Sequence, residues 1–238
     1  IPAVADDSDA TTMEPTKVAT YDALKSAIGG SAEKIVLTAD IDMTGEASIT
    51  VSRNVTLDLA GKQITKTQAK ITQDSDFTDQ NRMKIFTVSE NSTMEIVDSV
   101  GTGKIIGKAT QGSTLGKARG DTTLTVDGKN AVLKLTEVTV ESDYYGVAIW
   151  ENSKLVADGA TIRSVHASAV GLNGMATEGS KNAMLDINGG TYSSEEGPAF
   201  FISNTESFKI AEAVVEGPSA LDARAGTIEL TDVTIRMN

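Results

Sequence analysis

From Lys34 onward, apolar and polar residues alternate in short segments that are separated by turn residues. Alternation with a period of two predicts β-strands that bury one face. Residues 20–28 (TYDALKSAI) differ, because Tyr21, Leu24 and Ile28 recur at helical spacing before a pair of glycines. Thr20 can cap the N-terminus of such a segment. We therefore predict one short amphipathic helix that covers the first open edge of a β-rich body.

A six-residue pattern recurs within the β-rich part: an Asn, two variable residues, a large apolar residue, a variable residue and usually a second apolar residue. Its copies are NVTLDL (Asn54), NSTMEI (Asn91), NAVLKL (Asn130), NSKLVA (Asn152), NAMLDI (Asn182) and, more loosely, NTESFKI (Asn204), followed by AGTIEL, which lacks the Asn. A second segment follows the later copies at a fixed offset, as VTVES, ATIRS, GTYSS, AVVEG and VTIRM. Asn130 and Asn152 are 22 residues apart. This internal repeat indicates a solenoid.

A repeat of 22 residues with two or three short strands fits one coil of a right-handed parallel β-helix. Equivalent residues of successive coils then form columns along the long axis of the stack. One interior column is expected to hold Leu133, Leu155, Leu185 and Ile228. The Asn at each turn tolerates a left-handed backbone, and its side chain can hydrogen-bond its counterpart in the next coil.

The longer intervals between the repeated Asn residues indicate coils with inserted loops, at residues 66–84, 107–121 and 174–181. Residues 1–16 are acidic and aperiodic, so we interpret them as a flexible tail or linker. Residues 17–30 hold the capping helix, and residues 31–238 are predicted to form one continuous β-helix. The predicted fold class is therefore all-β, without a second domain.

Several stretches carry a resemblance to a known superfamily: the lead-in TYDALKSAI, then KIVLTADIDM, SITVSRNVTLDLAGKQI and the coils quoted above. Over residues 17–238 the chain resembles the pectate-lyase-like superfamily of β-helices, in particular the β-helical segments of large cell-surface proteins and adhesins of Gram-positive and gut bacteria. The resemblance implies the fold. It leaves the function open, since that superfamily includes lyases, hydrolases, adhesins and phage spikes.

Charge and composition restrict the class of partner. The net charge of −12 and the pI near 4.6 argue against nucleic acid, whose partners concentrate Lys and Arg. No apolar run approaches the ~18 residues that span a bilayer, so we expect no membrane insertion. The absence of Cys excludes disulfides and thiolate metal sites. We expect a secreted or cell-surface protein with neither a cofactor nor a bound metal.

The single histidine of the chain, His166, raises the question of catalysis. Aligning the coils places His166 in register with Tyr144 and Glu196, and it places Asp143 and Glu195 in the adjoining column. His166 is therefore a repeat position. No Ser, Cys or metal-ligand spacing supports a catalytic role for it.

The same columns predict a binding surface, because carboxylates beside exposed aromatic rings suit sugar recognition. The rings stack on the apolar faces of pyranoses, and the carboxylates accept hydrogen bonds from hydroxyls. The candidate ligand-binding residues are Asp143, Tyr144, Tyr145, Trp150, His166, Glu195 and Glu196. The alternative is that these are solvated turn residues whose rings pack on their own coil.

Signals for catalysis are scarce, since the paired-Asp pattern of a polygalacturonase-type hydrolase is absent. Two possibilities stay open: a glycosidase pair of Glu195 and Asp143, and a lyase-like arrangement of Arg163 beside those carboxylates. The acidic segment DSDFTDQN, residues 74–81, lacks the Gly and the closing Glu of an EF-hand loop. We favour a solvated loop there over a calcium site.

We therefore expect a secreted or surface-displayed β-solenoid with a structural or adhesive role, whose lateral face or inserted loops bind glycan or a host or bacterial surface protein. The alternative is a carbohydrate-active enzyme, either a polysaccharide lyase or a glycoside hydrolase, that acts on an extracellular polysaccharide. The sequence favours the non-enzymatic function. The chain stops directly after the strand in LTDVTIRMN, so we also expect end-to-end self-association or further coils of a longer protein at that end.

Overall fold

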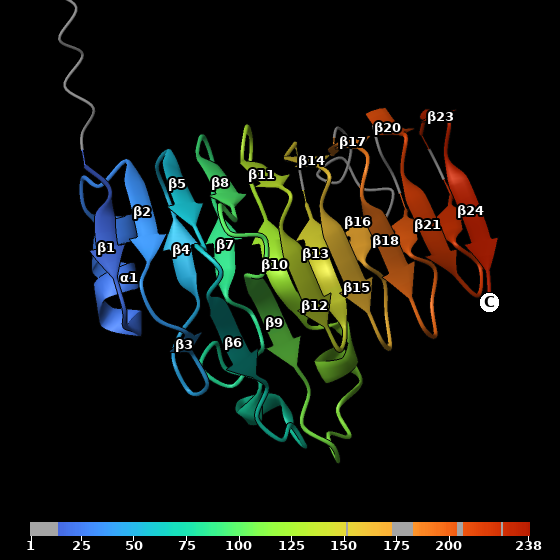
Figure 1. Cartoon of the computed structure of the whole chain (residues 1–238). Helices are drawn as coiled ribbons and strands as arrows, with labels where there is room; N and C mark the ends of the chain where they lie inside the picture. Colours follow the sequence, from blue (N-terminus) through green and yellow to red (C-terminus); the bar gives the residue numbers. More distant parts are fainter. Residues whose placement is uncertain (1–13, 151, 173–182, 204–206, 225) are drawn as a thin grey trace, which may run out of the picture.

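The computed structural model describes residues 14–150, 152–172, 183–203, 207–224 and 226–238, and it shows three β-sheets whose strands are all parallel (Figure 1). After the first strand, successive strands along the chain belong to the three sheets in turn, so one circuit of three strands makes one coil. Each strand pairs with the equivalent strands of the coils before and after it. The predicted all-β fold, a parallel β-helix, is thereby confirmed.

The described strands fall into sheets of nine, eight and seven strands. Sheet A contains β1 (Thr16–Val18), β2 (Lys34–Leu37), β5 (Val55–Asp58), β8 (Thr93–Val97), β11 (Val132–Thr136), β14 (Lys154–Asp158), β17 (Met184–Asn188), β20 (Ser207–Ala211) and β23 (Ile228–Thr231). Sheet B contains β3 (Ile41–Asp42), β6 (Gln63–Thr67), β9 (Lys104–Lys108), β12 (Thr139–Ser142), β15 (Thr161–Ser164), β18 (Thr191–Ser194), β21 (Val214–Gly217) and β24 (Thr234–Met237). Sheet C contains β4 (Ile49–Val51), β7 (Phe86–Val88), β10 (Thr122–Val126), β13 (Tyr145–Ile149), β16 (Val170–Leu172), β19 (Phe200–Ile202) and β22 (Leu221–Ala223).

The described helices are α1 (Tyr21–Gly29) and two short 3₁₀ helices, η1 (Asp74–Asp76) and η2 (Gly116–Gly120). None of them is long and apolar enough to cross a membrane.

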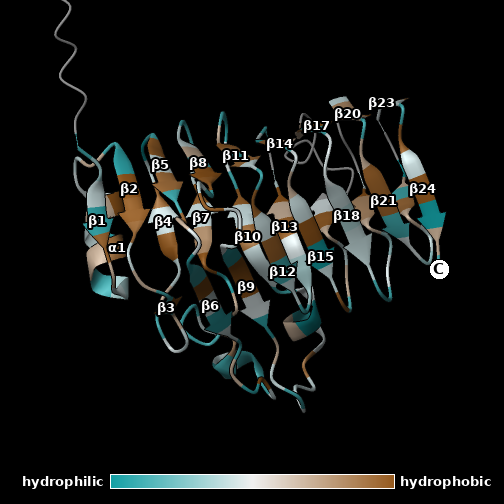
Figure 2. Cartoon of the chain, in the orientation of Figure 1, coloured by the Kyte–Doolittle hydropathy of each residue, from teal (hydrophilic) through white to brown (hydrophobic). Residues whose placement is uncertain are grey.

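The interior of the coils is filled by columns of apolar side chains. Leu133, Leu155 and Leu185 pair across β11, β14 and β17. Phe208 and Ile228 continue the same column in β20 and β23. The predicted interior column is thus confirmed, with Phe208 as an additional member. Along the strands, apolar and polar residues alternate, as Figure 2 shows, because one face of each sheet lines the interior and the other meets solvent.

The repeated Asn residues stand at turns. Asn91, Asn130 and Asn152 have φ angles of 56°, 60° and 52°, which lie in the left-handed region that Asn tolerates better than most residues. Nδ2 of Asn130 donates to Oδ1 of Asn91 at 2.9 Å, so the predicted contact between neighbouring coils is present. The copies that lie outside the described residues are Asn182 and Asn204.

Helix α1 covers the N-terminal end of the stack, as predicted (Figure 1). Oγ1 of Thr20 accepts the N–H of Ala23 at 3.2 Å, which confirms the predicted cap. Leu24 and Ile28 are buried in the core. Arg53 donates through Nε to the carbonyl of Ile28 at 2.8 Å and through Nη2 to two further carbonyls near the end of the helix. The bonds to Ile28 and Ala27 satisfy carbonyls that a helix leaves unpaired at its C-terminus, and the third bond, to Ala32, holds the segment that follows.

A short strand that the sequence analysis did not predict precedes the helix. β1 pairs in parallel with β2, with Val18 opposite Leu37. Residues 16–18 therefore belong to sheet A. The greater part of the predicted tail, residues 1–13, lies outside the described residues.

Two inserted loops leave the coils between sheets B and C, at the positions predicted near residues 66–84 and 107–121. They pack together as one lobe, defined here as residues 68–84 and 108–121, at the bottom of Figure 1. Nζ of Lys117 lies 2.6 Å from Oδ1 of Asp74, and the N–H of Thr114 donates to the carbonyl of Ile71 at 2.9 Å. The third predicted insertion, at residues 174–181, lies outside the described residues.

The C-terminal end of the stack presents apolar side chains. β22, β23 and β24 are the last strands of their sheets. The exposed fractions of Leu230, Ile235 and Met237 are 43%, 49% and 63%. The contact that we expect across this end stays a prediction.

Candidate functional site

The predicted ligand-binding residues lie on two neighbouring surfaces. One group occupies the corner between sheets B and C, in the turns of three successive coils, and consists of Asp143, Tyr144, His166, Glu195 and Glu196. The other group consists of Tyr145, the first residue of β13, and Trp150, which directly follows that strand. These two residues line a pocket on the outer face of sheet C.

The residues of the corner adopt the predicted register. The N–H of His166 donates to the carbonyl of Asp143 at 2.9 Å, and Nδ1 of His166 lies 3.0 Å from Oε1 of Glu196. The ring of His166 also lies 5.9 Å from that of Tyr144, centroid to centroid. His166 is thus placed by contacts along its column, as expected of a repeat position.

The two carboxylates considered as a glycosidase pair already have protein partners. Glu195 forms an ion pair with Arg163, and Oδ2 of Asp143 accepts the N–H of Ala109 at 2.6 Å. Tyr144 is buried, and this burial raises the pKa of its phenol. Both carboxylates of the considered pair are thus already bonded within the protein.

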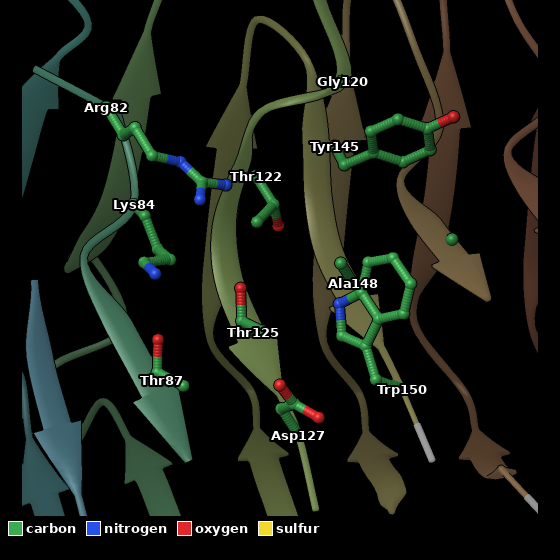
Figure 3. A pocket seen from close by; sticks show the side chains of 11 residues that line it. Arg82, Lys84, Thr87, Gly120, Thr122, Thr125, Asp127, Tyr145, Ala148 and Trp150 are labelled. Atoms are coloured by element: carbon green, nitrogen blue, oxygen red, sulfur yellow. The ribbon is translucent and has the colours of Figure 1, made fainter. Parts of the chain in front are cut away.

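The pocket on sheet C has a volume of about 180 Å³ (Figure 3). Its floor is a row of equivalent outward positions on adjacent strands, namely Thr87, Thr125, Ala148 and Gly171. In Figure 3, Tyr145 and Trp150 stand on one side of this floor, and Arg82 and Lys84 stand on the other. Asp127 lies at the end away from Arg82.

A break in the strand alternation turns Tyr145 toward the pocket. A Cβ on Gly146 would lie 2.6 Å from both the carbonyl oxygen of Ala169 and Cγ2 of the core residue Ile162, so Gly146 faces inward. Val147 faces inward as well, with 0% exposure. Two successive inward positions leave the preceding residue, Tyr145, outside the coil.

The ring of Tyr145 then lies across the next coil. A Cβ on Gly171 would be 2.7 Å from Cδ1 of Tyr145 and 2.8 Å from its Cε1. The glycine therefore makes room for the ring. Burial raises the pKa of the Tyr145 phenol, so this side chain is a neutral wall of the pocket at physiological pH.

Two hydroxyls of the floor have no partner. Oγ1 of Thr87 and Oγ1 of Thr125 are buried and lack a hydrogen bond within the described part of the chain. The two hydroxyl oxygens are covered by neighbouring atoms, so in this structure a ligand in the pocket meets the floor through other atoms of these side chains.

The cationic side of the pocket is held by a buried carboxylate, Asp121, whose side chain is 0% exposed. Its Oδ1 accepts Nε of Arg82 at 2.9 Å, and its Oδ2 accepts the N–H of Met83 at 2.8 Å. Oδ2 also accepts Nε2 of Gln68, and Oδ1 accepts the N–H of Thr122, both at 2.9 Å. One carboxylate thereby joins both loops of the lobe to the beginning of β10.

A buried lysine holds the same segment from its other end. Nζ of Lys66 donates to the carbonyls of Asp79 and Lys84, each at 3.0 Å, and the residue is 0% exposed. Burial lowers the pKa of Lys66 from 10.5 to about 8, although the negative charges of Asp79 and Asp121 act in the opposite direction. Residues 82–84 are thus fixed between a buried anion and a buried cation.

We expect the cost of burying Lys66 to appear as a pH dependence of stability. Below pH 8 the lysine is protonated in both states, whereas between pH 8 and 10.5 the folded state releases its proton first. The free energy of unfolding must then rise with pH across that window. Relative to Lys66→Met, the unaltered protein should gain roughly 2–3 kcal/mol between pH 7 and pH 10. Urea unfolding of both proteins at the two pH values measures this difference, and a difference that does not change with pH would contradict the assignment.

The acidic segment that the sequence raised as a calcium candidate is held by protein donors. Asp76 accepts the N–H and Oγ1 of Thr72 at 2.9 and 3.0 Å, and these bonds hold the pKa of Asp76 below its usual value. Burial opposes ionisation of Asp79, but hydrogen bonds from Ser48 and the charge of Lys84 outweigh it and lower the pKa of Asp79. The described residues contain no cluster of His, Asp or Glu arranged to hold a metal.

Two members of the pocket, Tyr145 and Trp150, could be predicted from the repeat pattern, and the others could not. The missed residues that contribute polar groups are Arg82, Lys84, Thr87, Thr122, Thr125 and Asp127. One feature of the sequence could have located Arg82, Lys84 and Thr122, because the first two insertions fall in successive coils. The points where the inserted loops rejoin the coils must therefore lie side by side, and those points carry Arg82, Lys84 and Thr122.

Comparisons of the chain with protein-family models, with curated proteins and with solved structures find no match in any of the three.

Proposed function

We propose that this chain is a secreted or surface-displayed glycan-binding module and that the pocket on sheet C holds one sugar ring. The observation that carries the proposal is that two aromatic side chains, Trp150 and Tyr145, line one pocket together with the charged side chains of Arg82, Lys84 and Asp127. Aromatic rings stack on the apolar faces of pyranoses, and charged side chains form hydrogen bonds with sugar hydroxyls.

The size and rigidity of the pocket support this function. Its volume of 180 Å³ is below the roughly 300–1,000 Å³ of pockets for drug-sized ligands, so it suits a single ring with the rest of the glycan outside. The floor consists of paired parallel strands. Side chains on such strands keep their positions without a ligand, which lowers the entropic cost of binding.

The carboxylates favour binding over cleavage. Among the described residues that line the pocket, Asp127 is the one carboxylate. Glycosidases usually place two carboxylates on opposite sides of the bond that they cleave. A structural or adhesive module that holds a glycan at the cell exterior needs no such pair, so we place this chain in that class.

Replacing Trp150 by alanine is expected to weaken glycan binding roughly tenfold or more, because truncating a buried aromatic anchor commonly costs more than 1.4 kcal/mol. The full chain would first be screened on immobilised neutral and acidic glycans, and bound glycans would then be titrated in solution. Trp150 is the only tryptophan of the chain and is 36% exposed, so its fluorescence reports occupancy of the pocket in the unaltered protein. Calorimetry gives the affinity of the variant.

The matched control is Val100→Ala, which truncates another exposed apolar residue, here 62% exposed, in the turn between β8 and β9 and outside the pocket. The Val100→Ala variant should bind the glycan with the same affinity as the unaltered protein. Failure of every glycan to bind, or unchanged binding by Trp150→Ala, would overturn the proposal. The same glycans should be incubated with the protein and assayed for new reducing ends and unsaturated products, because turnover would support the enzymatic alternative instead.

A further inference from the structure

One side of the pocket presents hydrogen-bond donors that the protein does not use. Nε of Arg82 binds Asp121, and the guanidinium carbon lies 4.7 Å from the ring centroid of Phe77. These two contacts fix one edge and one face of the guanidinium group. Its terminal nitrogens, Nη1 and Nη2, have no hydrogen-bond partner among the described residues, and the side chain reaches toward the pocket (Figure 3). A guanidinium group held in this way is prepared to bind an oxyanion.

Lys84 adds a second cation at the same side. Its Nζ lies 3.3 Å from Oδ1 of Asp79, and its side chain is 17% exposed. An ammonium group carries three donors, so contact with one carboxylate leaves donors for a ligand. Lys84 lines the pocket next to Arg82 and Thr87 (Figure 3).

The local charge balance is opposite to that of the whole chain. Lys66 lies among Arg82, Lys84, Asp79 and Asp121, which makes three cations against two carboxylates. The net charge of the chain is −12. Because Asp127 lies at the far end of the pocket, the cations outnumber the carboxylates only on the lobe side, and an anion is attracted to that side.

We propose that Arg82 and Lys84 bind an exocyclic anionic group, a carboxylate or a sulfate, on the sugar ring that occupies the pocket. This inference rests on the proposed glycan-binding function and specifies the ligand class. Trp150 and Tyr145 contact the ring, and Asp127 at the far end repels the anion, so the charged group points to the lobe. The ring of Tyr145 across Gly171 limits the pocket on its C-terminal side.

The test uses the full chain and matched pairs of methyl glycosides: glucose with glucuronic acid, galactose with galacturonic acid, and galactose with galactose 6-sulfate. Calorimetry at low ionic strength should show at least one acidic member binding at least tenfold more tightly than its neutral partner. The galacturonic acid and the 6-sulfate arms distinguish a carboxylate from a sulfate site. Raising NaCl from 50 to 500 mM should weaken binding of the acidic member severalfold and leave the neutral member unchanged.

Arg82→Gln and Lys84→Gln should each reduce the preference for the acidic member to threefold or less. The matched control is Lys117→Gln, which removes a cation from the same lobe but outside the pocket and should preserve the preference. Circular dichroism of each variant verifies the fold, and the salt dependence of the unaltered protein tests the inference without any substitution.

The outcomes separate this inference from the proposed function. Equal binding of acidic and neutral members would overturn the anion site and leave glycan binding in place. A preference that persists in both Gln variants would also overturn it. No binding by any of these sugars or by the glycan panel would overturn both proposals.

Discussion

Leu155→Ala is expected to lower the free energy of unfolding by about 2–5 kcal/mol, as is usual for a buried leucine that is truncated to alanine. Leu155 is 0% exposed and stands in an interior column between Leu133 and Leu185. The coil above and the coil below are held in register by parallel ladders, so they cannot move together to fill the cavity. Urea unfolding followed by circular dichroism measures the loss.

The control for this prediction is His166→Ala, in the turn between β15 and β16. The His166 side chain is 46% exposed, and its contact with Glu196 is an exposed pair. Such pairs contribute little, so the free energy of unfolding should change by less than about 0.5 kcal/mol. If His166→Ala proved the more damaging of the two substitutions, the assignment of interior and exterior positions would be wrong.

The fold could be predicted because equivalent positions of successive coils carry similar residues. The Asn of the turn and the apolar residues of the strand recur at the same offsets, so irregular residues in one coil do not obscure the register. β1 lacks this redundancy: its three residues, Thr16–Val18, form an edge strand outside the repeat. Its pairing with β2 is decided by tertiary contact, which sequence periodicity does not report.

The site could be predicted only in part, for the same reason. Tyr145 and Trp150 belong to a coil without an insertion, so the repeat gives each of them a register position in the stack. Arg82 and Lys84 follow an inserted loop without repeat register, and only the folded lobe brings them opposite the aromatic residues. The outward turn of Tyr145 depends on Gly146, whose inward position is visible only from its neighbours in the next coil.

Asp121→Ala is expected to be the most destabilising change in the lobe, with a loss of about 3–5 kcal/mol in the free energy of unfolding. The carboxylate is 0% exposed and accepts hydrogen bonds from Arg82 and Gln68 and from the backbone of Met83 and Thr122. Truncation removes all four acceptor contacts and leaves a partly buried guanidinium without its counterion. Each buried donor left unpaired costs about 1–3 kcal/mol, so relaxation of the lobe can recover only part of the loss.

The matched substitution is Asp74→Ala, because Asp74 also lies in the lobe and also pairs with a cation, Lys117, but its side chain is 80% exposed. Asp74→Ala should lower the free energy of unfolding by no more than about 1 kcal/mol, since solvent and salt screen an exposed ion pair. The two variants remove the same atoms and the same charge, so the difference between them isolates the effect of burial. Equal losses would mean that Asp121 does not organise the lobe. A large loss for Asp121→Ala together with unchanged glycan affinity would mean that the position of Arg82 does not depend on this carboxylate.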